Sequence, residues 1–348
     1  MRFSYVTLPD YPLAESLEHI KTADELGFYG CYAADETWHK DPYVLFAAAA
    51  DKTEQIRFGP SLAPLGLREP TLVCQAIATL DELTGGRMEC VIAIGNFSLL
   101  AQYGMNWAGM KPLSRVKEAH TVMRRLLDDG AIDFEGEFYR YSGLFTFARP
   151  VRERVPILIG SLRGPKSFQA AGEVFDGTHA FAQYSRESCE FMMEHVKIGA
   201  ERAGRDWREL DIAAWEVFAV APDSANAKLA AQTIGAFYIP AMHAEQLERH
   251  GISQADVKPI LDSFAAGDVQ GAIDAMTPEL AEKLSLAGTP AEIVEKIRTN
   301  IAPTGVNHMI LCITDGHLVK AFTGRDVEVP DVREQLRLVH DEVMPAFA

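Results

Sequence analysis

The residue types best suited to chemistry stand together at positions 35 to 39, directly after a short apolar run. Asp35 and Glu36 are adjacent carboxylates, and Trp38 and His39 add an indole and an imidazole that can line a pocket for an aromatic ring system. Neighbouring carboxylates repel each other when both are charged, so one can hold a proton near neutral pH and donate it. We therefore expect Asp35 and Glu36 to be catalytic and Trp38 and His39 to contact the substrate. The alternative is that one of the acids caps the following helix or pairs with an arginine.

A second chemical signal lies in residues 157–166, where an apolar run opens into a turn of small residues with two cations. Free N–H groups at a helix N-terminus attract anions, and the helix dipole adds to this attraction. The turn therefore predicts a phosphate site. An ordinary capped turn is the alternative, and barrel phosphates more often lie after strands seven and eight. The candidate cofactor-binding residues are Gly160, Ser161, Arg163, Gly164, Pro165 and Lys166.

Small residues also end two earlier apolar runs, at positions 59–64 and 94–98. Glycine and proline end regular strand pairing, and the lack of side-chain bulk lets a planar ligand approach the backbone. A plain turn is the alternative at residues 59–64. The candidates here are Ser61, Leu62, Ala63, Gly95 and Asn96 for a cofactor and Phe97 for the substrate.

The elements that must position these residues are short apolar runs that alternate with longer amphipathic segments. This alternation predicts an α/β fold with a parallel, helix-covered sheet, and eight strands are the number that closes a TIM barrel. An open doubly wound sheet is the alternative, but no G-x-G-x-x-G motif follows the first run. We expect a single (β/α)8 TIM-barrel domain over residues 1–348. The predicted strands are Phe3–Thr7, Gly30–Ala34, Ile56–Leu62, Met88–Gly95, Pro156–Gly160, Asp176–Phe181, Asp211–Ala221 and His308–Thr314.

Two stretches do not fit the simple alternation. Residues 107–150 contain a helix and then an aromatic, glycine-containing segment that predicts a small hairpin. Residues 224–287 predict a largely helical insertion between the seventh and eighth strands. Insertions at the C-terminal face of a barrel usually cover the active-site mouth, so we expect this one to form a lid or a pocket wall.

The composition limits the class of partner. There are 33 Lys and Arg against 49 Asp and Glu, a formal charge of −16, which disfavours nucleic acid and anionic membranes as partners. The five cysteines are scattered, with no CxxC pair, as in a reduced cytoplasmic protein. The chain shows neither an apolar signal segment nor a run long enough to span a bilayer. Metal-protease, P-loop and serine-hydrolase motifs are absent, so we expect no metal.

Four segments resemble the bacterial-luciferase-like superfamily of flavin- and deazaflavin-dependent oxidoreductases, in its methylenetetrahydromethanopterin reductase-like branch. They are Arg68–Gly95 (REPTLVCQAIATLDELTGGRMECVIAIG), Arg154–Phe181 (RVPILIGSLRGPKSFQAAGEVFDGTHAF), Ala33–Leu62 and Gly288–Ile313. The resemblance covers most of the chain outside the 224–287 insertion.

The resemblance implies a barrel, usually dimeric, with a flavin-type ring at its mouth. The ring belongs to the 8-hydroxy-5-deazaflavin coenzyme F420 in many members of this branch, and to FMN in others of the superfamily. A non-prolyl cis peptide is implied at Ser61–Leu62, the loop Gly160–Lys166 would hold the cofactor phosphate, and Asp35 and Glu36 would lie near the ring. Sugar-phosphate dehydrogenases of the superfamily place a histidine where this chain has Glu36. They also carry a glutamate just after strand four, where this chain reads Asn96-Phe97-Ser98.

The leading hypothesis is a deazaflavin-dependent oxidoreductase that transfers hydride to or from a small organic substrate, with Asp35 or Glu36 moving the accompanying proton. An FMN-dependent monooxygenase is the first alternative, and a non-catalytic flavin-binding protein is the second. We expect a cytoplasmic homodimer.

Overall fold

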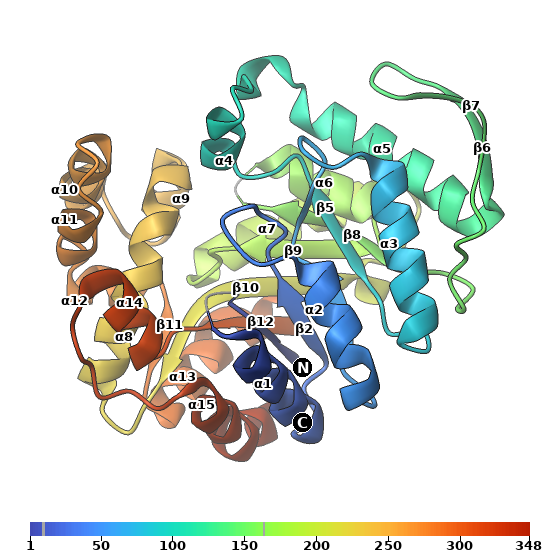
Figure 1. Ribbon diagram of the computed structural model, residues 1–348. Coiled ribbons are helices and arrows are strands. Elements are labelled where there is room, and N and C mark those ends of the chain that lie inside the picture. The colour runs from blue at the N-terminus through green and yellow to red at the C-terminus, as the bar shows by residue number, and fades with distance from the viewer. Residues whose placement is uncertain (9–10, 163) are drawn as a thin grey trace.

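The computed structural model describes residues 1–8, 11–162 and 164–348. Its central element is a parallel sheet that curves into a barrel, with helices around the outside (Figure 1). The strands of the barrel are β1 (Arg2–Val6), β2 (Gly30–Ala33), β3 (Arg57–Pro60), β4 (Ala63–Pro64), β5 (Cys90–Ala93), β8 (Ile157–Ser161), β9 (Gly177–Phe181), β10 (Asp211–Val220) and β12 (His308–Ile313).

The sheet closes through its third strand. Within the described residues the parallel order is β3-β2-β1-β12-β10-β9-β8-β5-β4, and the two ends of this order are consecutive segments of chain. A cis peptide bond between Ser61 and Leu62 lies between β3 and β4, as the resemblance implies. Phe58 of β3 also pairs with Met88, just before β5. With β3 and β4 counted as one bent strand, the described strands form the predicted eight-stranded TIM barrel.

The helices of the described residues follow most barrel strands, and most of them cover the outside of the barrel (Figure 1). They are α1 (Leu13–Glu25), α2 (Pro42–Ala49), α3 (Pro70–Leu83), α4 (Phe97–Gln102), α5 (Pro112–Asp129), α6 (Pro165–Glu173), α7 (Arg186–Arg202), α8 (Ser224–Tyr238), α9 (Ala244–Arg249), α10 (Gln254–Ala265), α11 (Val269–Asp274), α12 (Pro278–Lys283), α13 (Pro290–Lys296), α14 (Gly316–Thr323) and α15 (Val332–Leu338).

Side-chain caps set where the helices near the mouth begin. Asp41 accepts hydrogen bonds from the backbone N–H groups of Tyr43 and Val44, and Pro42 occupies the first turn of α2. Asn96 accepts from the N–H of Ser98 at the start of α4. A cap satisfies N–H groups that have no partner within the helix, and it therefore holds the loop before each helix in a defined conformation.

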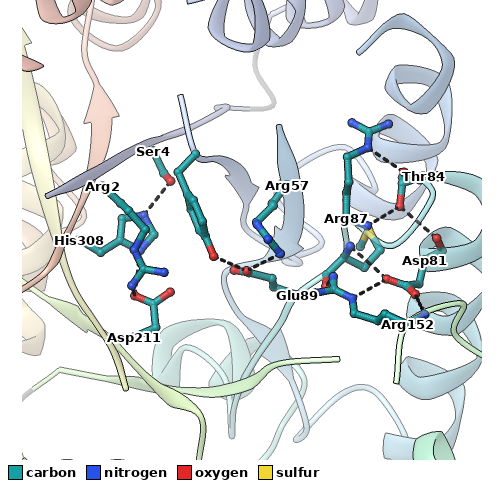
Figure 2. A network of polar contacts seen from close by, with 12 residues as sticks. Arg2, Ser4, Arg57, Asp81, Thr84, Arg87, Glu89, Arg152, Asp211 and His308 are labelled. Atoms are coloured by element: carbon teal, nitrogen blue, oxygen red, sulfur yellow. Dashed lines mark hydrogen bonds and ion pairs between the residues drawn. The ribbon is translucent and has the colours of Figure 1, made fainter. Parts of the chain in front are cut away.

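The strand starts fill the opposite end of the barrel with charged and polar groups. The Arg2 guanidinium donates to Asp211 at 2.8 Å. The His308 ring lies between two partners, with Nδ1 at 3.0 Å from Asp211 and Nε2 at 2.7 Å from the Ser4 hydroxyl. Figure 2 shows this group facing Arg57 and Glu89 across the barrel. Buried charged groups must be paired, and here each of them has a partner. We call this group of paired side chains the polar core.

Glu89 completes that polar core. It accepts hydrogen bonds from the hydroxyls of Tyr29 at 2.8 Å and Tyr32 at 2.7 Å, and it lies 3.5 Å from Arg57. These residues are at or near strand starts, away from the face where barrel enzymes carry their chemistry.

The two predicted excursions are both present. Strands β6 (Ala131–Glu135) and β7 (Arg140–Phe145) form an antiparallel hairpin beside α5 (Figure 1). Helices α8 to α12 form the insertion between β10 and β12. The sequence did not predict β11 (Leu286–Gly288), which pairs with Phe218–Val220 at the end of β10, because three residues are too short for a recognisable pattern.

All five cysteines are buried and unpaired. Burial raises the pKa of each thiol, which agrees with the reduced thiols expected from the sequence.

Candidate active site at the barrel mouth

Asp35 is a buried acid held by an arginine. It follows β2, and its carboxylate lies 2.5 and 2.9 Å from two nitrogens of Arg68. Arg68 also donates to Asp41 at 3.1 Å and lies over the Tyr43 ring at 4.7 Å. Burial raises the pKa of Asp35, while Arg68 lowers it. Asp35 thus has the arginine partner that the sequence predicts as an alternative. The pair holds the loop that carries Glu36.

Glu36 has a different environment from its neighbour. Burial raises its pKa to about 7, the charge of Asp35 adds to this rise, and a hydrogen bond from the Asn96 side chain opposes it. His39 lies 3.8 Å from the Glu36 carboxylate. A carboxyl with a pKa near neutrality can both hold and release a proton at physiological pH.

The loops after β2 and β5 meet at the mouth. The Trp38 indole donates to Gln102 at 2.8 Å, and Tyr103 donates to Thr37 at 3.2 Å. Together with the contact between Asn96 and Glu36, these bonds join the loop at 34–41 to α4. The structure thus brings Glu36, Trp38, His39 and Asn96, four of the candidate residues, close together. Phe97, in the first turn of α4, is 39% exposed and is available at the same rim.

The residues around the cis bond lie against β8. A Cβ added at Gly160 would approach Leu62 Cδ2 to 2.8 Å, so the absence of a side chain at Gly160 makes room for Leu62. Ser61 is buried and its hydroxyl lies 3.1 Å from His179 Nδ1 inside the barrel, and Ala63 is fully buried. The chain around the cis bond is therefore closely packed against the barrel.

Gly95 supplies a backbone shape that other residues rarely adopt. Its φ is +119°, and a Cβ there would come within 3.0 Å of Pro64. Positive φ is accessible to glycine at little cost, so Gly95 turns the chain from β5 into the Asn96 cap.

The predicted phosphate loop fits an anion in three respects. The Ser161 hydroxyl is buried and has no hydrogen-bond partner among the described residues. Gly164 begins α6 with only the Ser167 side chain near its Cβ position. Pro165 and Lys166 are exposed in the first turn, so the lysine can face a bound anion. Arg163 lies outside the described residues.

Two cavities lie away from these residues. One of about 540 Å³ is lined by the β6–β7 hairpin, including Phe134 and Tyr141. The other, of about 240 Å³, lies between the barrel and the insertion and is lined by Tyr184, His250 and Lys296, among others. Neither is lined by the predicted site residues, and neither has catalytic groups comparable to Glu36.

Sequence reasoning missed three residues at the mouth. Arg68 is 33 positions from Asp35, so no local pattern links them. Trp215 of β10 lies between Phe181 and Tyr238, with ring centroids at 5.1 and 5.4 Å. Tyr238 comes from α8. Burial is the largest cause of its raised pKa, and the charge of Glu36 contributes to the rise. The insertion thus brings an aromatic side chain against the ring of Trp215.

Among the described residues, no group of three His, Cys, Asp or Glu side chains is arranged to hold a metal ion. In the same part of the chain, no helix combines the length and apolar character needed to cross a membrane.

Comparisons with known proteins agree with this architecture. A family model described as luciferase-like monooxygenase matches residues 1–308. A 5,10-methylenetetrahydromethanopterin reductase of Archaeoglobus fulgidus is 28% identical over 349 residues, covering 99% of both chains. An F420-dependent glucose-6-phosphate dehydrogenase of Intrasporangium calvum is 27% identical over 315 residues, covering 85% of this chain and 88% of that protein. The structure of a coenzyme F420-dependent tetrahydromethanopterin reductase from Methanopyrus kandleri matches with a TM-score of 0.89 at 25% identity, covering 100% of this chain and 99% of that one.

Proposed function

The chain belongs to the luciferase-like monooxygenase family, and we propose that it is a coenzyme F420-dependent oxidoreductase acting on a small organic substrate at the barrel mouth. Relatives named for F420-dependent reduction or dehydrogenation align with it over most of its length. The observation in the site that carries the proposal is Glu36, a carboxyl with a pKa of about 7, held beside the other predicted mouth residues.

The residues of the mouth suit a planar cofactor with a phosphate-bearing tail. The backbone at Ser61–Ala63 and Gly95 would lie along the ring, and Ser161, Gly164 and Lys166 would hold the phosphate. When bound, the deazaflavin supplies or accepts the hydride. The phosphate tail needs a local anion site because the chain as a whole is acidic and would repel an anion.

Glu36 is the group we propose for the proton. During reduction of a C=C, C=N or C=O bond, its protonated carboxyl donates the proton that accompanies the hydride; in the reverse direction its carboxylate accepts one. Asn96 donates to the charged form, and this hydrogen bond opposes the rise in pKa caused by burial. Asp35 is a positioning residue, since its carboxylate is occupied by Arg68. Trp38, His39 and Phe97 would contact the substrate.

The proposal is tested with purified protein, F420 and FMN, following the visible spectrum. We expect F420 binding in the wild type and in Glu36→Gln, with turnover in the variant reduced by roughly 10²- to 10⁴-fold. Asp35→Asn is the matched variant: it removes the neighbouring charge but leaves the proton-carrying group in place, so its loss of turnover should be smaller.

Three results would count against this proposal. Tight FMN binding without F420 binding favours the monooxygenase alternative. F420 binding with no turnover of carbonyl, imine or alkene substrates favours the non-catalytic one. Unchanged turnover in Glu36→Gln removes Glu36 from the mechanism. A cytoplasmic homodimer remains our expectation.

A further inference from the structure

Helix α9 of the insertion is hydrogen-bonded to the loops that follow β8 and β9. Gln246 of α9 is 1% exposed, and its side-chain amide donates to the carbonyl of Leu162 at 3.0 Å and to that of Ala182 at 3.4 Å. Leu162 follows Ser161 directly in the predicted phosphate loop. A residue of the insertion is thus bonded to the backbone of that loop.

Leu162 is anchored from two further directions. Its carbonyl also accepts from the Gln183 amide at 3.2 Å. Its side chain packs against a hydrophobic cluster made largely by the insertion, which includes Ala236, Ile239 and Leu247. The backbone just before residue 163 therefore depends on both the barrel and the insertion for its position.

The rest of α9 is held to the β9 loop in the same way. His250, which follows α9, accepts from the Tyr184 N–H at 3.3 Å through Nε2, and its Nδ1 lies 2.7 Å from the Gln246 carbonyl. The Ser185 hydroxyl donates to the Arg249 carbonyl at 2.7 Å. These bonds fix α9 relative to the barrel, so that Gln246 meets Leu162 in a defined geometry.

We propose that Gln246 is a positioning residue for the cofactor phosphate, acting through the Leu162 carbonyl to fix the loop that carries Ser161 and Gly164. The insertion is then part of the cofactor site as well as a pocket wall. This inference rests on the proposed function, because it assumes that Ser161, Gly164 and Lys166 hold the phosphate of F420. The ring is proposed to lie along Ser61–Ala63 and Gly95, whereas Gln246 bonds to the Leu162 and Ala182 carbonyls, so ring binding should not depend on this residue.

The test compares F420 with the ribityl deazaflavin, which has the same ring and ribityl chain but lacks the phosphate and the tail beyond it. Gln246→Met keeps a flexible side chain of similar length but cannot donate a hydrogen bond. We expect its Kd for F420 to rise about tenfold, the effect of one lost hydrogen bond. Its Kd for the ribityl deazaflavin and the spectrum of the bound ring should be unchanged. Without any ligand, hydrogen exchange should be faster at residues 160–167 of the variant.

The matched control is Gln270→Met, in α11 of the same insertion, where the side-chain amide of Gln270 donates to Asp274 at 2.8 Å; it should behave as the wild type. Leu162→Ala is a second variant that alters the same loop, for use if Gln246→Met folds poorly. It should also raise the Kd for F420 and leave the Kd for the ribityl deazaflavin unchanged.

The outcomes separate the inference from the proposed function. A wild type that binds neither ligand refutes the proposed function and this inference with it. A wild type that binds both equally well refutes the phosphate loop. If the wild type prefers F420, equal Kd values in Gln246→Met and the wild type overturn the inference alone. Equal losses of affinity for F420 and for the ribityl deazaflavin also overturn it, because Gln246 would then support the whole mouth.

Discussion

Asp35 and Glu36 are adjacent carboxylic acids with different surroundings. Asp35 lies in a bidentate contact with Arg68, whereas Glu36 has a neutral amide, Asn96, as its hydrogen-bond donor. A guanidinium stabilises a carboxylate far more than an amide does. Desolvation therefore prevails at Glu36, and its pKa is brought to about 7. The difference between these two acids lies in their partners rather than in their positions along the chain.

This difference predicts a pH dependence of turnover. Because the raised pKa of Glu36 is about 7, its acid form predominates below that pH. We expect substrate reduction to slow as the pH rises through about 7, and the reverse reaction to accelerate over the same range. The measurement is kcat against pH in each direction. In Glu36→Gln the remaining activity should show no transition there; a transition that persists in this variant would assign it to another group.

At the scale of the element, the start of α4 links helix capping to the chemistry of the acid. Asn96 caps α4 through its carbonyl oxygen and contacts Glu36 through its side chain, so one residue sets both the helix start and the proton affinity. The preceding Gly95, with its positive φ, directs the chain into this arrangement.

Replacing Asn96 by Asp separates its two roles. The carboxylate still accepts from the Ser98 N–H, so the cap is kept, but it places a negative charge beside Glu36 and removes the amide donor. We expect the midpoint of the pH–rate profile to rise by about one unit or more. Asn96→Ala loses the cap, at a cost of about 1 kcal/mol in unfolding free energy, and should raise the midpoint less because it adds no charge. A midpoint that falls in Asn96→Asp would contradict the assignment.

At the scale of the whole molecule, the polar core and the proposed site lie at opposite ends of the barrel. The strand starts carry the polar core of Figure 2, where Asp211 contacts both Arg2 and His308, while the strand ends carry the loops of the mouth. Burial acts to raise the pKa of Asp211, but His308 and Arg2 outweigh it and hold the value at about 2.

The polar core predicts how stability depends on pH. A carboxylate with a lowered folded-state pKa stabilises the fold above its unfolded value, near 4, and this contribution is lost as the pH falls toward 2. Asp211→Asn removes the negative charge that Arg2 and His308 share, and we expect it to lower the unfolding free energy at pH 7 by roughly 3–5 kcal/mol. Asp262→Asn, at an exposed pair with Lys258 on α10, is the control and should change it little. Denaturant unfolding at pH 7 and pH 3 measures both; equal stability of Asp211→Asn and the wild type would contradict the role of the core.

The sequence was sufficient for the barrel and for part of the mouth. Strand positions follow from hydrophobic runs, and the observed strands agree with the predicted ones to within two residues at each end. The cluster of Glu36, Trp38 and His39 is local and could be recognised as a site. Arg68, Trp215 and Tyr238 could not, because they reach the mouth only when the barrel closes and the insertion folds onto it. The same limit applies to the size of the rise in the pKa of Glu36, because its largest cause is burial.

The buried cysteines have a practical consequence for following the mouth in solution. All five are enclosed, and their raised pKa values keep the thiols protonated, so reagents that attack thiolates have no accessible target on the folded chain. A cysteine introduced at the exposed position 37 would be the single reactive thiol. A fluorescent or spin label attached there would report on the loop beside Glu36 against a silent background, without first removing any native cysteine.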